Sequence, residues 1–156
     1  MAAAPLFTTA VESFMAARPE LEPVFPIHWE ELALFKDKMP LDPCWESFAA
    51  YESTGKLLFV TLRERGRLAG YFVGIVAPAL HYHGTLTAKM DLLYVVPEHR
   101  GNDGGNILLD AVMAELKRRG VQLVWMGSKN HKPIEGLFES RGFTHEESYF
   151  AKWIGE

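Results

Sequence analysis

The chain has 156 residues, of which 48% are hydrophobic and 23% charged, a balance typical of a globular protein with one hydrophobic core. Its net charge of −4 argues against the basic surface that general nucleic-acid or membrane-surface binding requires. The only cysteine, Cys44, cannot form a disulfide within the chain, and the N-terminus lacks the basic start and apolar core of a secretory signal. We therefore expect one cytoplasmic domain over residues 1–156.

The N-terminal third is predicted to be mainly helical. Residues 9–12, Thr-Ala-Val-Glu, form a capping-box pattern, which predicts a short helix that ends before Pro19. Closely spaced prolines then favour an extended chain, with a short edge strand at 24–27. A second helix is expected over 29–38. A third is expected over 42–55, because it begins with an Asp-Pro pair and ends at a glycine.

Strand patterns dominate the middle of the chain. Two apolar runs at 57–62 and 68–76 flank a polar Arg- and Gly-containing segment, which predicts a β-hairpin. A loop at 78–84 follows, and a third strand is expected over 85–96. The loop carries His81, Tyr82 and His83, which are candidates for a pocket edge. Two imidazoles alone do not make a zinc site, so no metal is expected.

Residues 91–119 read as strand, glycine loop and helix. Pro97 has no N–H for a sheet ladder and should end the strand, and Gly120 should end the helix. Free backbone N–H groups converge where a glycine loop enters a helix, so this is a candidate anion site. The spacing fits neither a dinucleotide fingerprint nor a P-loop.

The C-terminal part continues the alternation. A strand is expected at 121–126, a short helix at 133–140, and a final hairpin or pair of strands at 143–154. The strand, helix and strand between 85 and 126 should form a right-handed parallel crossover.

The glycine loop resembles motif A of the GNAT N-acetyltransferase superfamily, since Val95-Val96-Pro97 is followed by the run Arg-Gly-Asn-Asp-Gly-Gly at 100–105. The resemblance covers 57–146. It implies an α/β fold with a mixed, mostly antiparallel central sheet, a splayed parallel strand pair and flanking helices. It places the coenzyme A site within 57–156 and leaves 1–56 as variable helices on the acceptor side. Three motifs together add a similarity to small GNAT proteins of tailed bacteriophages: His-Trp-Glu-Glu at 28–31, His-Tyr-His at 81–83 and the run from Asp91 to Arg100.

The resemblance implies that acetyl-coenzyme A is the acyl donor and that the loop amides hold its diphosphate. The residues that it assigns to the coenzyme lie in the third strand, in the glycine loop and after the 121–126 strand. They are Leu93, Tyr94, Val95, Val96, Arg100, Gly101, Asn102, Asp103, Gly104, Gly105, Asn106, Asn130, His131, Lys132 and Phe138.

Asp103 departs from the family pattern, which usually has a glycine at this position. Two explanations stay open. Aspartate tolerates a left-handed backbone, so Asp103 can keep the shape of the loop. Alternatively, its carboxylate caps the helix and competes with phosphate for the same donors.

Three residues are candidates for catalysis. Asp91 is the candidate general base, with a structural partnership to Lys89, an arginine or a nearby backbone donor as the alternative. The N–H of Val95 is the candidate oxyanion donor, with ordinary ladder bonding as the alternative. Relatives place the catalytic group four or six residues before this valine, on the same strand face. Phe138 stands where the family often has a proton-donating tyrosine. Tyr149, Tyr94 and Tyr82 are candidate replacements, and a proton from water or direct release of the thiolate is the alternative.

The predicted function is acetyl transfer to a primary amine of a small molecule or a protein, and a second copy of the chain is an open option as a partner. The rival is a catalytically inactive GNAT-fold binding module, which the residues at 103 and 138 favour.

Overall fold

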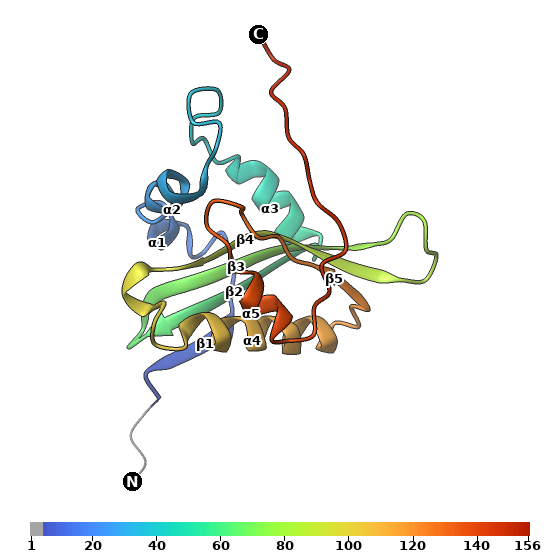
Figure 1. Cartoon of the computed structure of the whole chain (residues 1–156). Helices are drawn as coiled ribbons and strands as arrows, with labels where there is room; N and C mark the ends of the chain where they lie inside the picture. The colour runs from blue at the N-terminus through green and yellow to red at the C-terminus, as the bar shows by residue number, and fades with distance from the viewer. Residues whose placement is uncertain (1–4) are drawn as a thin grey trace.

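The computed structural model describes residues 5–156 and contains a five-stranded sheet in the order β1-β2-β3-β4-β5 (Figure 1). The first four strands pair antiparallel in succession, and β4 pairs with β5 in parallel. This mixed, mostly antiparallel sheet confirms the expected fold class. The strands are β1 (Phe7–Val11), β2 (Leu57–Glu64), β3 (Arg67–Pro78), β4 (Leu86–Val95) and β5 (Leu123–Trp125).

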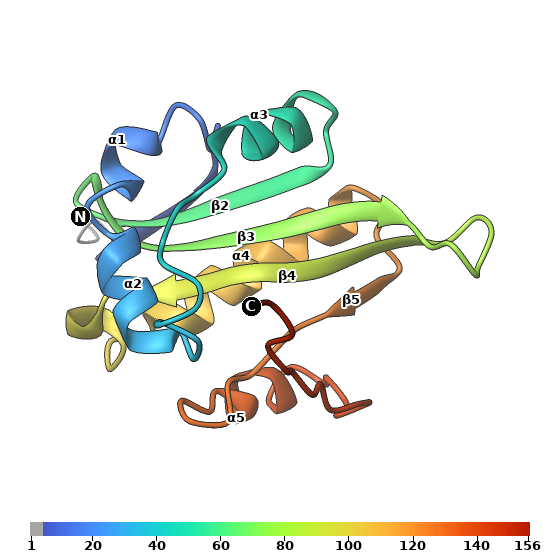
Figure 2. The ribbon, with the colours of Figure 1, turned by 90° about the horizontal axis from the view of Figure 1, so that it is seen from above.

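Helices cover both faces of the sheet. Figures 1 and 2 show three short helices on one face and the long helix α4 across the other, with α5 beside β5. A 3-10 turn, Pro97–His99, leads from β4 towards α4. The helices are α1 (Arg18–Leu21), α2 (Phe25–Leu32), α3 (Trp45–Ser53), α4 (Gly104–Arg118) and α5 (Glu135–Glu139).

The two faces have different cores. The α4 face buries aliphatic side chains such as Leu58, Val60 and Leu108. The opposite face buries an aromatic cluster that includes Phe14, Phe25, Phe59, Tyr71 and Tyr94.

Two predictions for the N-terminal third were wrong. Residues 9–12 do not open a helix, because Phe7–Val11 is the edge strand β1, with Val11 opposite Val60. Glu12, which would have closed the capping box, instead accepts hydrogen bonds from Arg63 and Thr61 of β2. The region 24–27 is not a strand but the start of α2. Its proline lies in the first helical turn, where a missing N–H costs nothing.

The other helices and strands follow the sequence more closely. The β2–β3 hairpin turns at Arg65 and Gly66, which both have positive φ angles (49° and 83°). The helix expected over 29–38 ends at Leu32, and α3 begins at Trp45 as the third expected helix. Gly120, with φ 80°, follows the end of α4.

The final hairpin or pair of strands expected at 143–154 was also wrong. Residues 143–156 form no strand, and the chain leaves the sheet as an exposed arm in which Phe150 is 97% exposed (Figure 1). The segment has strand-forming side chains, but it pairs with none of the five strands that the structure describes.

Candidate active site

The glycine loop ends in a left-handed residue that directs the chain into α4. Asp103 has φ 66° and ψ 4°, and its side chain does not cap the helix. Its carboxylate instead accepts a hydrogen bond from the side-chain amide of Asn106. The first explanation of the departure at this position is thus supported. Within residues 5–156 the N–H groups of Gly104, Gly105 and Asn106 have no acceptor, as is usual for a first helical turn.

Gly104 allows the N-terminus of α4 to lie directly against the sheet. A Cβ atom at this position would lie 3.0 Å from the carbonyl oxygen of His99 and 3.1 Å from Cδ2 of Leu62. Gly101, two residues before the left-handed turn, would meet nothing within 4 Å. The close approach therefore depends on one glycine of the loop, and it fixes the direction in which the free amides point.

The parallel strands β4 and β5 separate beside this loop. Their pairing covers only three residues of each strand and ends at Lys89 and Trp125, whereas β4 continues to Val95. The N–H of Val96 donates to the oxygen of Ala69 at 2.9 Å. Alternate residues of an antiparallel strand point their N–H groups to opposite sides, so the N–H of Val95 faces the β5 side, beyond the last pair. The predicted oxyanion donor is thus placed at the opening between the strands.

Asp91 is an extra residue in β4. Val73 of β3 lies opposite Leu92, and Gly74 lies opposite Met90, so Asp91 has no partner and forms a β-bulge. The bulge also changes the side-chain alternation. Lys89 lies opposite Ile75, on the aromatic side, whereas Val95 packs against the aliphatic core. The expectation that positions 89 and 95 share a face was wrong for this reason.

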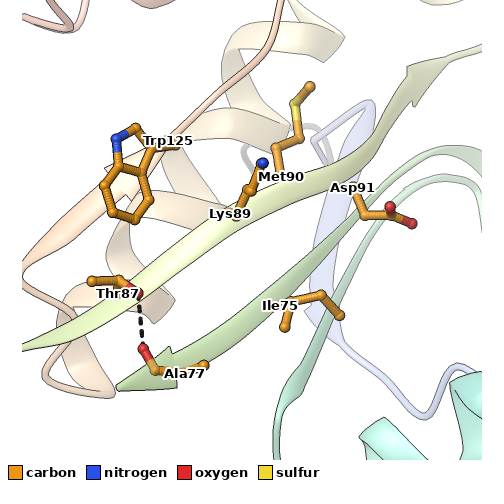
Figure 3. A pocket seen from close by; sticks show the side chains of 7 residues that line it. All are labelled: Ile75, Ala77, Thr87, Lys89, Met90, Asp91 and Trp125. Carbon is orange, nitrogen blue, oxygen red and sulfur yellow. Dashed lines mark hydrogen bonds between the residues drawn. The ribbon is translucent and has the colours of Figure 1, made fainter. Parts of the chain in front are cut away.

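The Asp91 side chain borders a depression of about 460 Å³. Figure 3 shows the carboxylate at one end and the Trp125 indole at the other, with Lys89 and Met90 between them. Four of the residues that line the depression are apolar or aromatic, namely Ile75, Ala77, Met90 and Trp125. The other three are Thr87, Lys89 and Asp91.

The electrostatics of Asp91 fit a general base better than a structural partner. Within residues 5–156 its carboxylate forms no ion pair and no hydrogen bond, while the Lys89 ammonium lies 4.9 Å from the ring centre of Tyr149. Partial burial in the depression raises the pKa of Asp91, although the side chain stays open to solvent. An unpaired carboxylate of raised pKa is suited to accepting a proton.

Arg100 is engaged by the protein itself. Its guanidinium forms a bidentate ion pair with Glu31 of α2, at 2.6 and 2.8 Å, and donates to the carbonyl oxygen of Val95 at 2.8 Å. The hydrogen bond from Arg100 lowers the pKa of the Glu31 carboxyl. Arg100 therefore ties α2 to the end of β4, and it reaches a phosphate only by leaving Glu31.

A buried polar cluster lies beneath α2, and the sequence did not reveal it. Nδ1 of His28 and the hydroxyl of Tyr71 are 2.7 Å apart, and the imidazole stacks on Tyr94 with 4.4 Å between ring centres. Burial lowers the pKa of His28 to about 4 and raises the pKa of Tyr71. The Tyr94 hydroxyl is buried and has no hydrogen-bond partner among residues 5–156. The signal in the sequence that could have indicated a buried His28 was its position three residues after Phe25, which places both side chains on the same face of a helix.

The remaining predicted residues are not drawn together. Phe138 is buried against Phe143, with 5.7 Å between ring centres, which fits a core role. Tyr149 is 71% exposed, and its hydroxyl donates a hydrogen bond to the Glu147 carboxylate at 2.7 Å. Its ring lies next to the ammonium of Lys89, a residue that lines the depression. Exposed loops hold the others, namely Asn130, His131 and Lys132 after β5 and His81, Tyr82 and His83 between β3 and β4.

Comparison with known families identifies the class of protein. The model of the acetyltransferase (GNAT) family matches residues 17–143, and the chain therefore belongs to this family. This result confirms the resemblance inferred from motif A and defines the protein as an acetyl-coenzyme A-dependent N-acyltransferase by family. No curated protein matches the chain.

Solved structures share the fold at low sequence identity. A ribosomal-protein-alanine N-acetyltransferase from Brucella melitensis biovar Abortus 2308 has a TM-score of 0.77 at 16% identity, covering 96% of this chain and 99% of that one. An aminoglycoside acetyltransferase from an uncultured soil metagenomic sample has 0.74 at 11%, covering 97% of each chain. A predicted acetyltransferase with acetyl-CoA from Clostridium acetobutylicum has 0.71 at 12%, covering 95% and 96%.

Two kinds of feature are absent from residues 5–156. No group of three or more potential metal ligands is found in this part of the chain. None of its helices is long and apolar enough to cross a bilayer.

Proposed function

We propose that the protein transfers an acetyl group from acetyl-CoA to a primary amine. The observation that carries the proposal is the position of the free amides at the start of α4, directly beside the opening between β4 and β5. Amides at a helix N-terminus favour a diphosphate, and the opening offers a path for the thioester arm. Residues 57–156 then hold the coenzyme, and residues 1–56 border the acceptor.

Direct attack of the amine on the thioester carbonyl suits this arrangement. The amine nitrogen forms a bond to the carbonyl carbon, and the N–H of Val95 stabilises the oxyanion. Asp91, directly or through a water molecule, accepts the proton from the amine. The carbon–sulfur bond then breaks, and the thiolate leaves with a proton from Tyr149 or from water.

The acceptor is proposed to be a small-molecule amine or a protein amine, approached from the side of α2 and the depression at Asp91. Acetyl-CoA supplies the acyl group, and the site as proposed uses no metal. We place this reaction in the cytoplasm. The similarity to small bacteriophage proteins stays a prediction.

Coenzyme binding is tested by thermal unfolding during a titration with acetyl-CoA. An intact site stabilises the folded state by RT ln(1 + [L]/Kd), which is about 2.7 kcal/mol at one hundred times Kd. No shift at millimolar acetyl-CoA would overturn the proposal and favour the inactive binding module.

Turnover is tested separately, by measuring free thiol released from acetyl-CoA in the presence of an amine library. Release above the rate without amine identifies acceptors. Binding without release for any protein or small-molecule amine would leave a coenzyme-binding module in place of an enzyme.

A further inference from the structure

The depression at Asp91 holds two opposite charges that do not neutralise each other. The Asp91 carboxylate and the Lys89 ammonium both line it. Within residues 5–156 neither of them forms an ion pair or a hydrogen bond. The pKa of Asp91 is raised by burial, with no contribution from a neighbouring cation, which agrees with a separation between the two charges. A partly buried charge is costly unless it is paired, so the depression offers a place for two charges of a ligand.

The Lys89 ammonium is held by an aromatic ring instead of a counter-ion. It lies 4.9 Å from the ring centre of Tyr149. A cation–π contact of this kind fixes the position of an ammonium group but does not neutralise its charge. Lys89 therefore stays available to bind an anionic group inside the depression.

The register of the sheet sets the order of the groups along the depression. Lys89 lies opposite Ile75 of β3 and Trp125 of β5, so these three side chains share one face. The bulge at Asp91 re-aims the next carboxylate away from the regular alternation of β4. Figure 3 shows Lys89 between the Asp91 carboxylate and the Trp125 indole. The order is thus an anion, a cation and an aromatic ring.

The rest of the depression suits an apolar group. Ile75, Ala77 and Met90 line it together with the Trp125 indole. Its volume of about 460 Å³ lies within the roughly 300–1,000 Å³ of sites for small molecules. Among the described residues that line it, Asp91 is the only anion.

We infer that the acceptor is a free α-amino acid with an apolar or aromatic side chain. The inference rests on the proposed acetyl transfer and specifies its acceptor. An α-amino acid carries an ammonium and a carboxylate on one carbon, so a single molecule supplies a partner for each unpaired charge. The ammonium binds at Asp91, the carboxylate binds at Lys89, and the side chain lies against Trp125.

This binding mode places the nucleophile beside its base. The bound ammonium gives one proton to Asp91 and becomes a free amine. The nitrogen then forms a bond to the thioester carbonyl carbon, and the carbon–sulfur bond breaks with its electron pair on the sulfur. The second proton that the nitrogen loses passes to the departing thiolate, directly or through water. The products are an N-acetyl amino acid and the coenzyme A thiol, and Asp91 releases its proton to solvent.

Other classes of amine fit the two charges less well. The N-terminus of a peptide has an amide group where Lys89 requires a carboxylate, and a simple arylalkylamine has no group there at all. A polyamine brings a second ammonium towards Lys89. Two like charges at 4 Å repel by about 1 kcal/mol in water and by about 4 kcal/mol at an intermediate dielectric constant.

Thiol release from acetyl-CoA gives the first test, with L-phenylalanine, L-phenylalaninamide, 2-phenylethylamine and spermidine as acceptors. We expect kcat/KM for phenylalanine to exceed each of the others by about tenfold or more. Lys89→Met should lower the ratio of phenylalanine to phenylalaninamide by about tenfold, mainly through KM. Lys117→Met changes an exposed lysine of α4 and should keep the native ratio. Equal native rates with the acid and its amide, or a ratio that Lys89→Met does not alter, overturns the inference.

The position of the acceptor side chain is tested by filling the depression. Ala77→Phe adds a ring to its lining and should lower kcat/KM for L-phenylalanine by about tenfold more than for L-alanine. An equal loss for the two amino acids would show that the acceptor side chain does not lie there.

Calorimetry separates this inference from the proposed function. L-phenylalanine is titrated into the protein saturated with coenzyme A, and Lys89→Met should weaken its binding by about tenfold. Such binding without any thiol release would refute acetyl transfer and keep the amino acid as the ligand. Thiol release with other amines, without binding of phenylalanine, would keep acetyl transfer and overturn the amino acid as its acceptor.

Discussion

The two faces of the sheet are built for different tasks. The α4 face has one long helix over an aliphatic core, and its first turn is fixed against the sheet at Gly104. The opposite face has three short helices over aromatic side chains, with a buried histidine and a tyrosine hydroxyl that finds no hydrogen-bond partner in the described part of the chain. The first face presents fixed backbone donors, which suits a constant coenzyme. The second holds ionisable side chains between short helices, which suits a variable acceptor.

The largest expected effect is the loss of catalytic rate when Asp91, on the proposed acceptor side of the sheet, is replaced. Asp91→Asn removes the proposed base and should lower kcat by about 100-fold or more, while the Kd for acetyl-CoA stays within about twofold. Because burial raises the pKa of Asp91, the native kcat/KM should rise with pH through a midpoint above the usual aspartate range. Steady-state kinetics and calorimetry measure both quantities, and an unchanged rate would remove Asp91 from the mechanism.

Although Asp91→Asn should lower kcat, the same substitution should increase the stability of the folded protein. Protonated Asp91 is favoured in the folded state, so its ionisation at neutral pH opposes folding. Asp91→Asn should therefore raise Tm slightly, by less than about 2 °C, because the side chain is partly solvated.

The α4 face should be sensitive to a single methyl group. Gly104→Ala places a Cβ against the carbonyl of His99 and should cost about 1–3 kcal/mol of unfolding free energy and weaken acetyl-CoA binding. Gly101→Ala, which meets nothing within 4 Å, is the matched control and should change neither. Urea unfolding and calorimetry measure the pair, and equal behaviour of the two variants would contradict the close approach.

The aromatic face should be the part of the molecule that is sensitive to mild acid. Burial lowers the pKa of His28 to about 4, so the unfolded chain takes up a proton before the folded protein does. Stability should thus fall by about 2 kcal/mol from about pH 7.5 to about pH 5. His28→Phe keeps the stacking on Tyr94 and should flatten this slope, whereas His83→Gln in the exposed loop should not. Urea unfolding at both pH values tests the expectation.

A smaller effect, on the affinity for acetyl-CoA, is expected at Asp103. Its carboxylate lies at the start of α4, and removal of the charge should tighten acetyl-CoA binding by about 1 kcal/mol, or roughly fivefold. Both Asp103→Gly and Asp103→Asn tolerate the left-handed backbone, so both should show the gain if charge is the cause. A gain in the glycine variant alone would point to backbone strain instead.

Local patterns predicted the strand, loop and helix around motif A well. The strand, loop and helix around motif A depend on neighbours in sequence, such as the glycines and Pro97, and they appear where expected. The hairpin at Arg65 and Gly66 likewise depends on residues that are close in sequence.

Features that depend on distant partners were missed. Residues 7–11 become a strand only because β2 offers an edge, and the carboxylate of Glu12 is taken by Arg63, far away in sequence. The engagement of Arg100 by Glu31 and the contact between His28 and Tyr71 likewise join separate segments. Residues 143–156 show the reverse case, since they have the composition of a strand but pair with no strand of residues 5–156.

The pairing of β3 with β4 does not require Asp91. Met90 and Leu92 already face Gly74 and Val73, so a chain shortened by this one residue would keep every other pair of β3 and β4. In a library of single-residue deletions, loss of residue 91 should give a folded but inactive protein, whereas loss of Val73 should disrupt the register. The pairing of β3 and β4 gives no structural reason for this residue, which agrees with the role of general base that we propose for Asp91.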